Sequence, residues 1–298
     1  MPLSLALLLA AADPQGPSPS PPPAEPPIDY LAFERLDDRM TVPVSLGAAG
    51  PFDFIIDTGA QRTVISRELA DELKLAAGPR VRLTAMTGTT HVGTVVVPQL
   101  SVSTASATKI EAPALERRNL GARGILGIDT LQGHAVAIDF DRGRMEVVPS
   151  VKRKRRSHGA PGEIVVRAKS LFGQLVVTDA TFRGSRIRVI LDTGSAVSMG
   201  NEPLRRLVRR AHGEATPVEL LSVIGGKMTA GYTQVPQVKI GSVTFENLPV
   251  AFSASAPFKQ FGLEDRPAIL LGMDALRLFR RVHIDFANRE VRLVMPRA

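Results

Sequence analysis

The segment Phe54-Ile55-Ile56-Asp57-Thr58-Gly59-Ala60 returns 135 residues later as Val189-Ile190-Leu191-Asp192-Thr193-Gly194-Ser195. In both copies an apolar run leads directly into Asp-Thr-Gly. A single Asp-Thr-Gly is typical of an ordinary β-turn, because turns favour Asp and Gly. Two copies in matching surroundings indicate instead that one structural unit occurs twice in the chain.

Three further segments of the first half recur in the second half in the same order, and we call each recurrence an echo. Val97-Pro98-Gln99 returns at 235–237, residues 124–129 return at 269–274, and residues 137–140 return at 283–286. The offset grows from 135 to 146, which adds about eleven residues to the second half, most of them expected in the loop 253–267. We therefore predict an N-terminal lobe at 28–150, a basic linker at 151–162 and a C-terminal lobe at 163–298.

Length and composition suit a soluble globular protein with either one large domain or two lobes, each with its own core. The chain has 298 residues, of which 44% are hydrophobic and 22% charged. Aromatic residues make up 5% and Trp is absent, so the cores must consist mainly of Val, Ile, Leu and Ala. The absence of Cys excludes disulfides, thiolate metal sites and a cysteine nucleophile.

The net charge of +8 is concentrated in residues 152–156 and in the arginines at 205, 206, 209 and 210. Neither stretch has a nucleic-acid-binding motif or interleaved aromatic residues, so we expect a solvated linker and a solvated helix face, and no nucleic-acid partner. The five histidines are scattered without ligand spacing, so neither a metal nor a cofactor is expected.

Many short segments rich in Val, Ile and Thr predict a mainly β architecture. The clearest strand signals lie at 39–46, 52–56, 91–97, 135–140, 173–178, 187–191, 235–240 and 282–286. One helix is expected after each Asp-Thr-Gly, at 66–75 with Ser66 as N-cap and at 201–211 with Asn201 as N-cap. In the second helix, the residues Leu204, Leu207, Val208 and Ala211 form an apolar stripe.

A hydrophobic-hydrophobic-Gly sequence follows each Asp-Thr-Gly after 70 to 80 residues, at 125–127 and 270–272. With both motifs in both halves, residues 30 to the end resemble the aspartic proteases, in particular the retropepsin-like ones of bacteria. The resemblance implies a two-lobed, pseudo-twofold acid-protease fold, retropepsin- or pepsin-like, with one short helix after each catalytic loop. It implies that Asp57 and Asp192 are catalytic and that the two threonines hydrogen-bond across the axis. The supporting loop residues would be Thr58, Gly59, Ala60, Thr193, Gly194 and Ser195.

Two carboxylates about 3 Å apart cannot both ionise, so they share a proton. One can then accept a proton from water while the other donates to the substrate carbonyl. We expect an aspartic endopeptidase acting on polypeptides in a cleft between the lobes. A non-catalytic peptide-binding protein with the same fold, and a protease active only as a dimer of chains, are the alternatives. The linker favours a monomer with an intramolecular pseudo-dimer through effective concentration.

Retropepsins cover the substrate with hairpin flaps. The corresponding stretches here are Met86-Thr87-Gly88 and Ile224-Gly225-Gly226, where Gly permits a tight turn and hinge motion. Two ordinary hairpins are the alternative. Neither stretch contains the Tyr of a pepsin flap, so the chain looks closer to a fused retropepsin dimer.

The two halves differ after Asp-Thr-Gly, where the first has Ala60 and the second Ser195. A hydroxyl at this position can donate to its own Asp and lower the pKa of that carboxyl. The sequence therefore predicts that Asp192 carries most of the charge of the pair. Asp139 and Asp285, which begin Asp-Phe pairs at strand ends, are expected to be structural.

Residues 1–27 are expected to lie outside the folded body. The apolar run 3–12 is too short to span a bilayer and ends in three alanines, which suits a signal peptide, although no basic residue precedes it. A disordered apolar tail is the alternative. The Pro-rich stretch 13–27 favours an extended linker. We therefore expect export to the periplasm or cell envelope of a bacterium, where the N-terminus is cleaved or associates with the membrane.

Overall fold

The computed structural model describes residues 30–32, 34–36, 39–153, 159–160, 162–171, 173–212 and 215–296. The expected signal peptide and Pro-rich linker at 1–27 lie outside the described residues, as does the basic run from Lys154 onward. Within the described part of the chain, no helix is long and apolar enough to cross a membrane.

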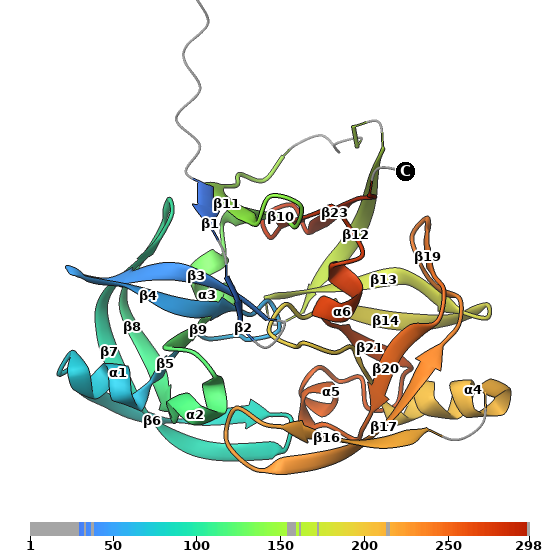
Figure 1. The fold of residues 1–298 in the computed structure, drawn as a ribbon, viewed down its shortest axis with the longest axis horizontal. Helices are drawn as coiled ribbons and strands as arrows, with labels where there is room; N and C mark the ends of the chain where they lie inside the picture. Colours follow the sequence, from blue (N-terminus) through green and yellow to red (C-terminus); the bar gives the residue numbers. More distant parts are fainter. Residues whose placement is uncertain are drawn as a thin grey trace, which may run out of the picture.

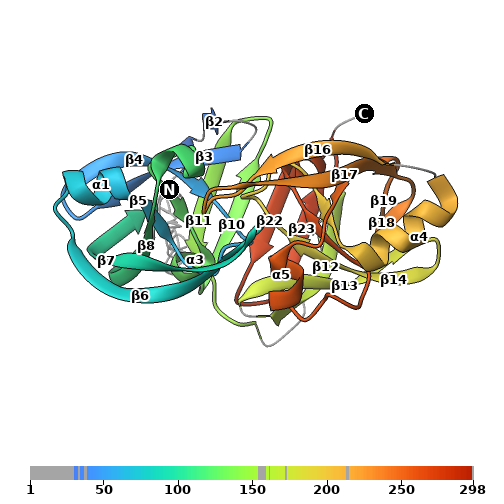
Figure 2. The ribbon, with the colours of Figure 1, turned by 90° about the horizontal axis from the view of Figure 1, so that it is seen from below.

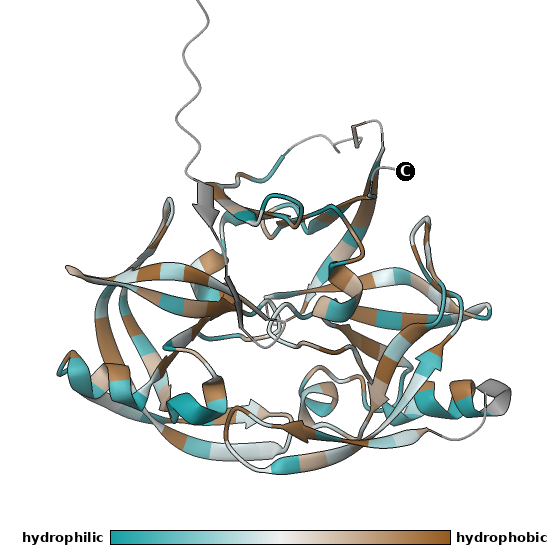
Figure 3. Ribbon diagram, in the orientation of Figure 1, coloured by the Kyte–Doolittle hydropathy of each residue, from teal (hydrophilic) through white to brown (hydrophobic). Residues whose placement is uncertain are grey.

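The fold is mainly β and consists of two lobes side by side (Figure 1). The N-terminal lobe contains an eight-stranded sheet, in spatial order β2 (Glu34–Leu36), β3 (Arg39–Leu46), β4 (Ala49–Ile56), β9 (Gly124–Leu126), β5 (Val64–Ser66), β8 (Ala105–Leu115), β7 (Gly88–Val102) and β6 (Ala76–Ala85). Hydrophobic and hydrophilic residues alternate along many strands of both lobes (Figure 3), as expected where one face of a sheet covers a core.

A second, 15-stranded sheet runs through the C-terminal lobe and into the N-terminal one. Its lobe-forming strands are β12 (Glu163–Leu171), β13 (Gln174–Phe182), β14 (Ser185–Leu191), β21 (Ala268–Leu271), β15 (Met199–Gly200), β20 (Leu248–Phe252), β17 (Lys227–Val235) and β16 (Thr216–Leu221), with β18 (Val238–Ile240) and β19 (Val243–Phe245) paired to the side. The strands that join the lobes are β1 (Tyr30–Ala32), β11 (Arg144–Pro149), β10 (His134–Asp139), β22 (Arg281–Asp285) and β23 (Glu290–Val294).

The pairing of the joining strands shows where the pseudo-twofold axis passes. β10 pairs antiparallel with β22, and Ala137 lies opposite His283. These two residues are 146 positions apart, which is the offset of the last sequence echo. The repeat therefore pairs with itself at this point, as identical surfaces do around a twofold axis.

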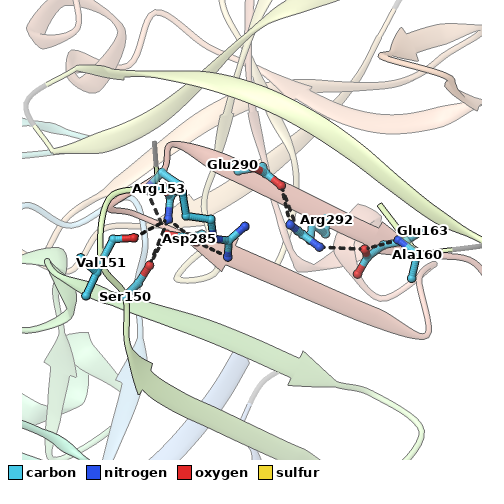
Figure 4. Close-up of polar contacts among 9 residues, drawn as sticks. Ser150, Val151, Arg153, Ala160, Glu163, Asp285, Glu290 and Arg292 are labelled. Carbon is cyan, nitrogen blue, oxygen red and sulfur yellow. Dashed lines mark hydrogen bonds and ion pairs between the residues drawn. The ribbon is translucent and has the colours of Figure 1, made fainter. Parts of the chain in front are cut away.

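Hydrogen bonds and an ion pair connect the start of the linker to the joining strands (Figure 4). The buried carboxylate of Asp285 accepts from Ser150 Oγ at 2.7 Å and from Asn288 Nδ2 at 2.9 Å, and pairs with Arg153 at 3.3 Å. Asp139, at the matching strand end, accepts from Arg281 at 2.9 Å. Both aspartates thus have the structural contacts expected of them.

The recurrence of the hydrophobic-hydrophobic-Gly sequence, at 125–127 and 270–272, is explained by parallel strand pairing beside each Asp-Thr-Gly. β4 pairs in parallel with β9, and β14 pairs in parallel with β21, so each hydrophobic-hydrophobic-Gly segment lies beside the strand that leads into an aspartate. At the end of β21, a Cβ on Gly272 would lie 2.6 Å from the backbone of Val197. Gly127 is packed against the backbone of Arg62 in the same way, so the loops need glycine at both positions.

The expected strands correspond to strands of the structure with one exception. The stretch 235–240 is not one strand, because β17 ends at Val235 and β18 begins at Val238. Pro236 has no N–H to continue the ladder, and Gln237 adopts a left-handed φ of 53°. The prediction of a single strand there is wrong.

The two expected helices form as α1 (Arg67–Glu72) and α4 (Glu202–His212). Ser66 and Asn201 cap them, accepting from Leu69 N at 3.2 Å and Leu204 N at 3.1 Å. The single-turn helices α2 (Arg117–Leu120), α3 (Ile128–Leu131), α5 (Ala256–Gln260) and α6 (Met273–Leu276) were not expected, since one turn is too short for a periodic pattern.

Candidate active site

The two Asp-Thr-Gly loops meet between the lobes, and each glycine lies against the aspartate of the other loop. A Cβ on Gly59 would lie 2.9 Å from Asp192 Cγ, and a Cβ on Gly194 would collide with the Asp57 carboxyl. Glycine is therefore required at both positions, because any side chain would push the two carboxyl groups apart. The side chains of Asp57 and Asp192 are hydrogen-bonded to each other.

The threonines lock the two loops together by four hydrogen bonds that cross the axis. Thr58 N donates to Thr193 Oγ1 at 3.1 Å, and Thr193 N donates to Thr58 Oγ1 at 3.2 Å. The hydroxyls donate in turn to carbonyls at the ends of the opposite strands, Thr58 to Leu191 O and Thr193 to Ile56 O, both at 2.8 Å. Every bond has its pseudo-symmetric counterpart, so neither loop can move without the other.

The two carboxyl groups differ in their surroundings. Asp57 Oδ1 accepts from the N–H groups of Gly59 and Ala60, both at 2.8 Å. Asp192 Oδ1 accepts from Gly194 N at the longer distance of 3.1 Å. Burial raises the pKa of Asp192 well above its usual range, and the adjacent Asp57 raises it further, outweighing the N–H groups of Gly194 and Ser195. Asp192 therefore holds its proton at a pH where an ordinary aspartate is ionised.

The expected role of Ser195 is wrong. Its hydroxyl donates to the carbonyl of Val197 at 2.7 Å, so its one proton is not directed at Asp192. Asp192 therefore lacks the hydroxyl donor that was expected to favour its ionised form. No pattern in the sequence indicates that a carbonyl two residues away competes for this hydroxyl.

A second pair of carboxylates, which sequence reasoning missed, supports the loops from behind. Asp129 accepts from the hydroxyl of Thr63 at 2.7 Å, and Asp274 accepts from that of Ser198 at 2.6 Å. Burial raises the pKa of Asp274 despite the hydrogen bonds from Ser198. The signal was present, because the Leu-Gly echoes both end in Asp and both hydroxyl residues follow Asp-Thr-Gly at the same distance.

The expected flap residues lie at the turns of two hairpins. Met86 and Thr87 join β6 to β7, whose first residue is Gly88, whereas Ile224, Gly225 and Gly226 lie between β16 and β17. Gly225 and Gly226 have φ values of 84° and 83°, which glycine adopts without strain.

Seen from below, the hairpins extend past each other from opposite lobes (Figure 2). Met86 packs against a C-terminal-lobe cluster containing Phe258 and Phe261, and Ile224 packs against an N-terminal-lobe cluster containing Leu120. The hairpins also touch directly, because Thr87 Oγ1 donates to Gly225 O at 3.4 Å. Each turn therefore rests on the lobe that it does not belong to.

The described residues contain no group of three or more His, Cys, Asp or Glu side chains placed to hold a metal ion. The chemistry that this site offers is that of two adjacent carboxyl groups with different hydrogen-bond donors, held by loops that are bonded to each other.

Two family models match the chain, one in each lobe. Residues 42–133 match the model described as "gag-polyprotein putative aspartyl protease", and residues 178–275 match the model described as "Aspartyl protease". A search of curated proteins finds no significant match. The two matches each contain one of the Asp-Thr-Gly loops that meet at the axis. With one such domain in each lobe, the chain belongs to the retropepsin-like aspartic proteases.

Proposed function

We propose that the protein is an aspartic endopeptidase in which Asp57 and Asp192 activate a water molecule in a cleft between the lobes. The observation that carries this proposal is that the two Asp-Thr-Gly loops meet between the lobes, with each glycine against the aspartate of the other loop, so that the two carboxyl groups lie together. The raised pKa of Asp192, caused by burial and by Asp57, supports a protonated Asp192 beside an ionised Asp57. An acid and a base side by side are what general acid–base hydrolysis of an amide requires.

In this mechanism, Asp57 accepts a proton from water as the water oxygen attacks the carbonyl carbon of the scissile peptide. Asp192 donates its proton to the carbonyl oxygen, so a neutral gem-diol forms. Asp57 then gives its proton to the amide nitrogen while Asp192 takes back a proton from one hydroxyl of the gem-diol. The C–N bond breaks, the products are a carboxylic acid and an amine, and both aspartates return to their starting forms. The loops gain rigidity from the threonine bonds, which keeps the two carboxyl groups in place throughout.

We propose that the β6–β7 and β16–β17 hairpins cover the substrate. Their turns rest on the opposite lobes through side-chain packing and one 3.4 Å hydrogen bond, so opening requires little more than loss of these contacts. We expect an extended polypeptide to bind between the hairpins and the loops, and the protein to act as a monomer containing an intramolecular pseudo-dimer. The location proposed for this activity is the periplasm or cell envelope.

Cleavage of a peptide library by the purified protein tests the proposal, with Asp57→Asn and Asp192→Asn as matched variants. Each substitution keeps the size of the side chain but removes a carboxyl group, so each is expected to abolish cleavage while the circular dichroism spectrum stays unchanged. Near-normal cleavage by either variant would refute the assignment. A wild type that binds library peptides without cleaving them would favour the alternative, a non-catalytic peptide-binding protein.

A further inference from the structure

Gln174 of the C-terminal lobe reaches the catalytic loop of the N-terminal lobe. It is the first residue of β13, and its side chain is fully buried. Its amide Nε2 donates to the carbonyl oxygen of Gly59 at 2.9 Å. Gly59 lies two residues after Asp57, so a side chain from one lobe contacts the loop that positions the aspartate of the other.

The contact leads to Asp57 through a single peptide group. The carbonyl of Gly59 and the N–H of Ala60 belong to the same peptide unit, and that N–H donates to Asp57 Oδ1 at 2.8 Å. A donor on the carbonyl oxygen polarises the peptide and makes its N–H a stronger donor. The chain Gln174–Gly59–Ala60–Asp57 therefore favours the ionised form of the Asp57 carboxyl.

The fold holds Gln174 in this position. The preceding Gly173 has a φ of 94°, and a Cβ there would lie 2.5 Å from Ile128 Cδ1 and 2.9 Å from Gln132 Nε2. Gly173 is thus packed against α3 and the residue that follows it in the other lobe. The remaining amide atom, Gln174 Oε1, is buried without a partner among the described residues. A buried amide left half-satisfied lowers stability, so packing alone does not account for Gln at this position.

We propose that Gln174 is a positioning residue that stabilises the negative charge of Asp57 from across the lobe interface. Its catalytic consequence rests on the proposed function, whereas its effect on Asp57 does not. The charged groups around the loop are Asp192, which faces Asp57, and Asp129, which contacts the loop from α3 through Thr63.

The two halves of the repeat have different residues at this position. Gln174 pairs with Leu171 where the β12–β13 hairpin closes, and Arg39 pairs with Leu36 where the β2–β3 hairpin closes. The two positions are 135 residues apart, as are the two aspartates. The halves therefore differ in side-chain chemistry at equivalent positions, although their catalytic motifs agree.

The first experiment measures Asp57 without its partner. In an Asp192→Asn background, which prevents self-digestion and leaves Asp57 to titrate alone, the free energy of unfolding in urea is measured from pH 2.5 to pH 7. Gln174→Met removes the donor at similar volume and is expected to raise the pKa of folded Asp57 by roughly 0.5 unit. The destabilisation should then grow as the pH rises through that pKa. A destabilisation that is constant across the pH range would refute the proposal, because a merely structural role gives that result.

Gln132→Met is the matched control, because it removes an exposed amide from the same inter-lobe contact without touching Gly59. Its effect on stability should not change with pH. An equal pH dependence in this control would also overturn the proposal, since the effect would then belong to the contact and not to the Gly59 carbonyl.

The second experiment uses the active chain. The acid limb of kcat/KM against pH, which reports ionisation of the base, is expected to move to higher pH by roughly 0.5 unit in Gln174→Met and to stay in place in Gln132→Met. An unmoved limb together with reduced activity would show a structural role. If the wild type cleaves nothing, the proposed function fails, while the unfolding experiment still decides the role of Gln174.

Discussion

Thr193→Val should destabilise the protein out of proportion to the small chemical change. The hydroxyl of Thr193 accepts from Thr58 N at 3.1 Å and donates to Ile56 O at 2.8 Å, and the residue is fully buried. Valine has the same shape, so the substitution opens no cavity but leaves one buried N–H and one buried carbonyl without partners. Each such group costs about 1–3 kcal/mol, so we expect a loss of about 2–6 kcal/mol for the two.

The assay is urea unfolding in the Asp192→Asn background, with Thr108→Val as the control. Thr108 lies exposed on β8, and the same substitution there should change the free energy of unfolding by less than about 0.5 kcal/mol. Thr58→Val should match Thr193→Val, because its hydroxyl bonds to the equivalent pair of backbone groups.

The double variant tests whether the four bonds act separately. The two threonine hydroxyls bond to four different backbone groups, so the two losses should add if the loops stay in place. A single variant within about 0.5 kcal/mol of the exposed control would refute the reasoning, because the freed groups would then have found other partners.

Ser195→Ala should leave both limbs of the pH–rate profile unmoved, because its hydroxyl donates to Val197 O; a shift of the upper limb to higher pH would restore the role expected from the sequence. Asp285→Asn should destabilise the protein at pH 7 but much less at pH 2, which urea unfolding at the two pH values measures. Burial alone would raise the pKa of Asp285, but hydrogen bonds from Ser150 and Asn288 and the charge of Arg153 lower it below its usual value. The ionised carboxylate therefore stabilises the folded protein at pH 7, and this contribution is lost as the pH falls below about 4. An equal loss of stability in the variant at both pH values would contradict this. Fractionation of tagged full-length protein should place it in the periplasm or envelope, and recovery of all of it uncleaved in the cytoplasm would exclude export.

The sequence predicted the parts of the fold that occur twice. A motif that occurs twice is easier to interpret than a single one, because the surroundings of one copy can be compared with those of the other. For this reason the Asp-Thr-Gly loops and the Leu-Gly segments were recognised together, and the structure places them side by side through parallel strand pairs. The capped helices were predicted for a local reason, since Ser66 and Asn201 each accept from an N–H three residues ahead.

What the sequence did not predict depends on competition between partners. The hydroxyl of Ser195 can reach a carboxylate or a carbonyl, and only the local path of the backbone decides that it donates to Val197. The contact of Gln174 with Gly59 joins residues 115 positions apart in different lobes. No periodicity or spacing marks such a contact, so it becomes visible only once the lobes are placed together.

The differences between the halves bear on how a symmetric scaffold performs an asymmetric reaction. In a dimer of identical chains, the two aspartates have equal surroundings, and the shared proton has no preferred side until a substrate binds. A single chain is free to differ between its halves. Here the differences lie around a motif that both halves share. Asp57 Oδ1 accepts from two N–H groups at 2.8 Å, one of them on the peptide that Gln174 contacts, whereas Asp192 Oδ1 accepts from Gly194 N at the longer distance of 3.1 Å. A single chain with unlike halves can therefore favour one aspartate as the base before the substrate arrives, as the proposed mechanism requires.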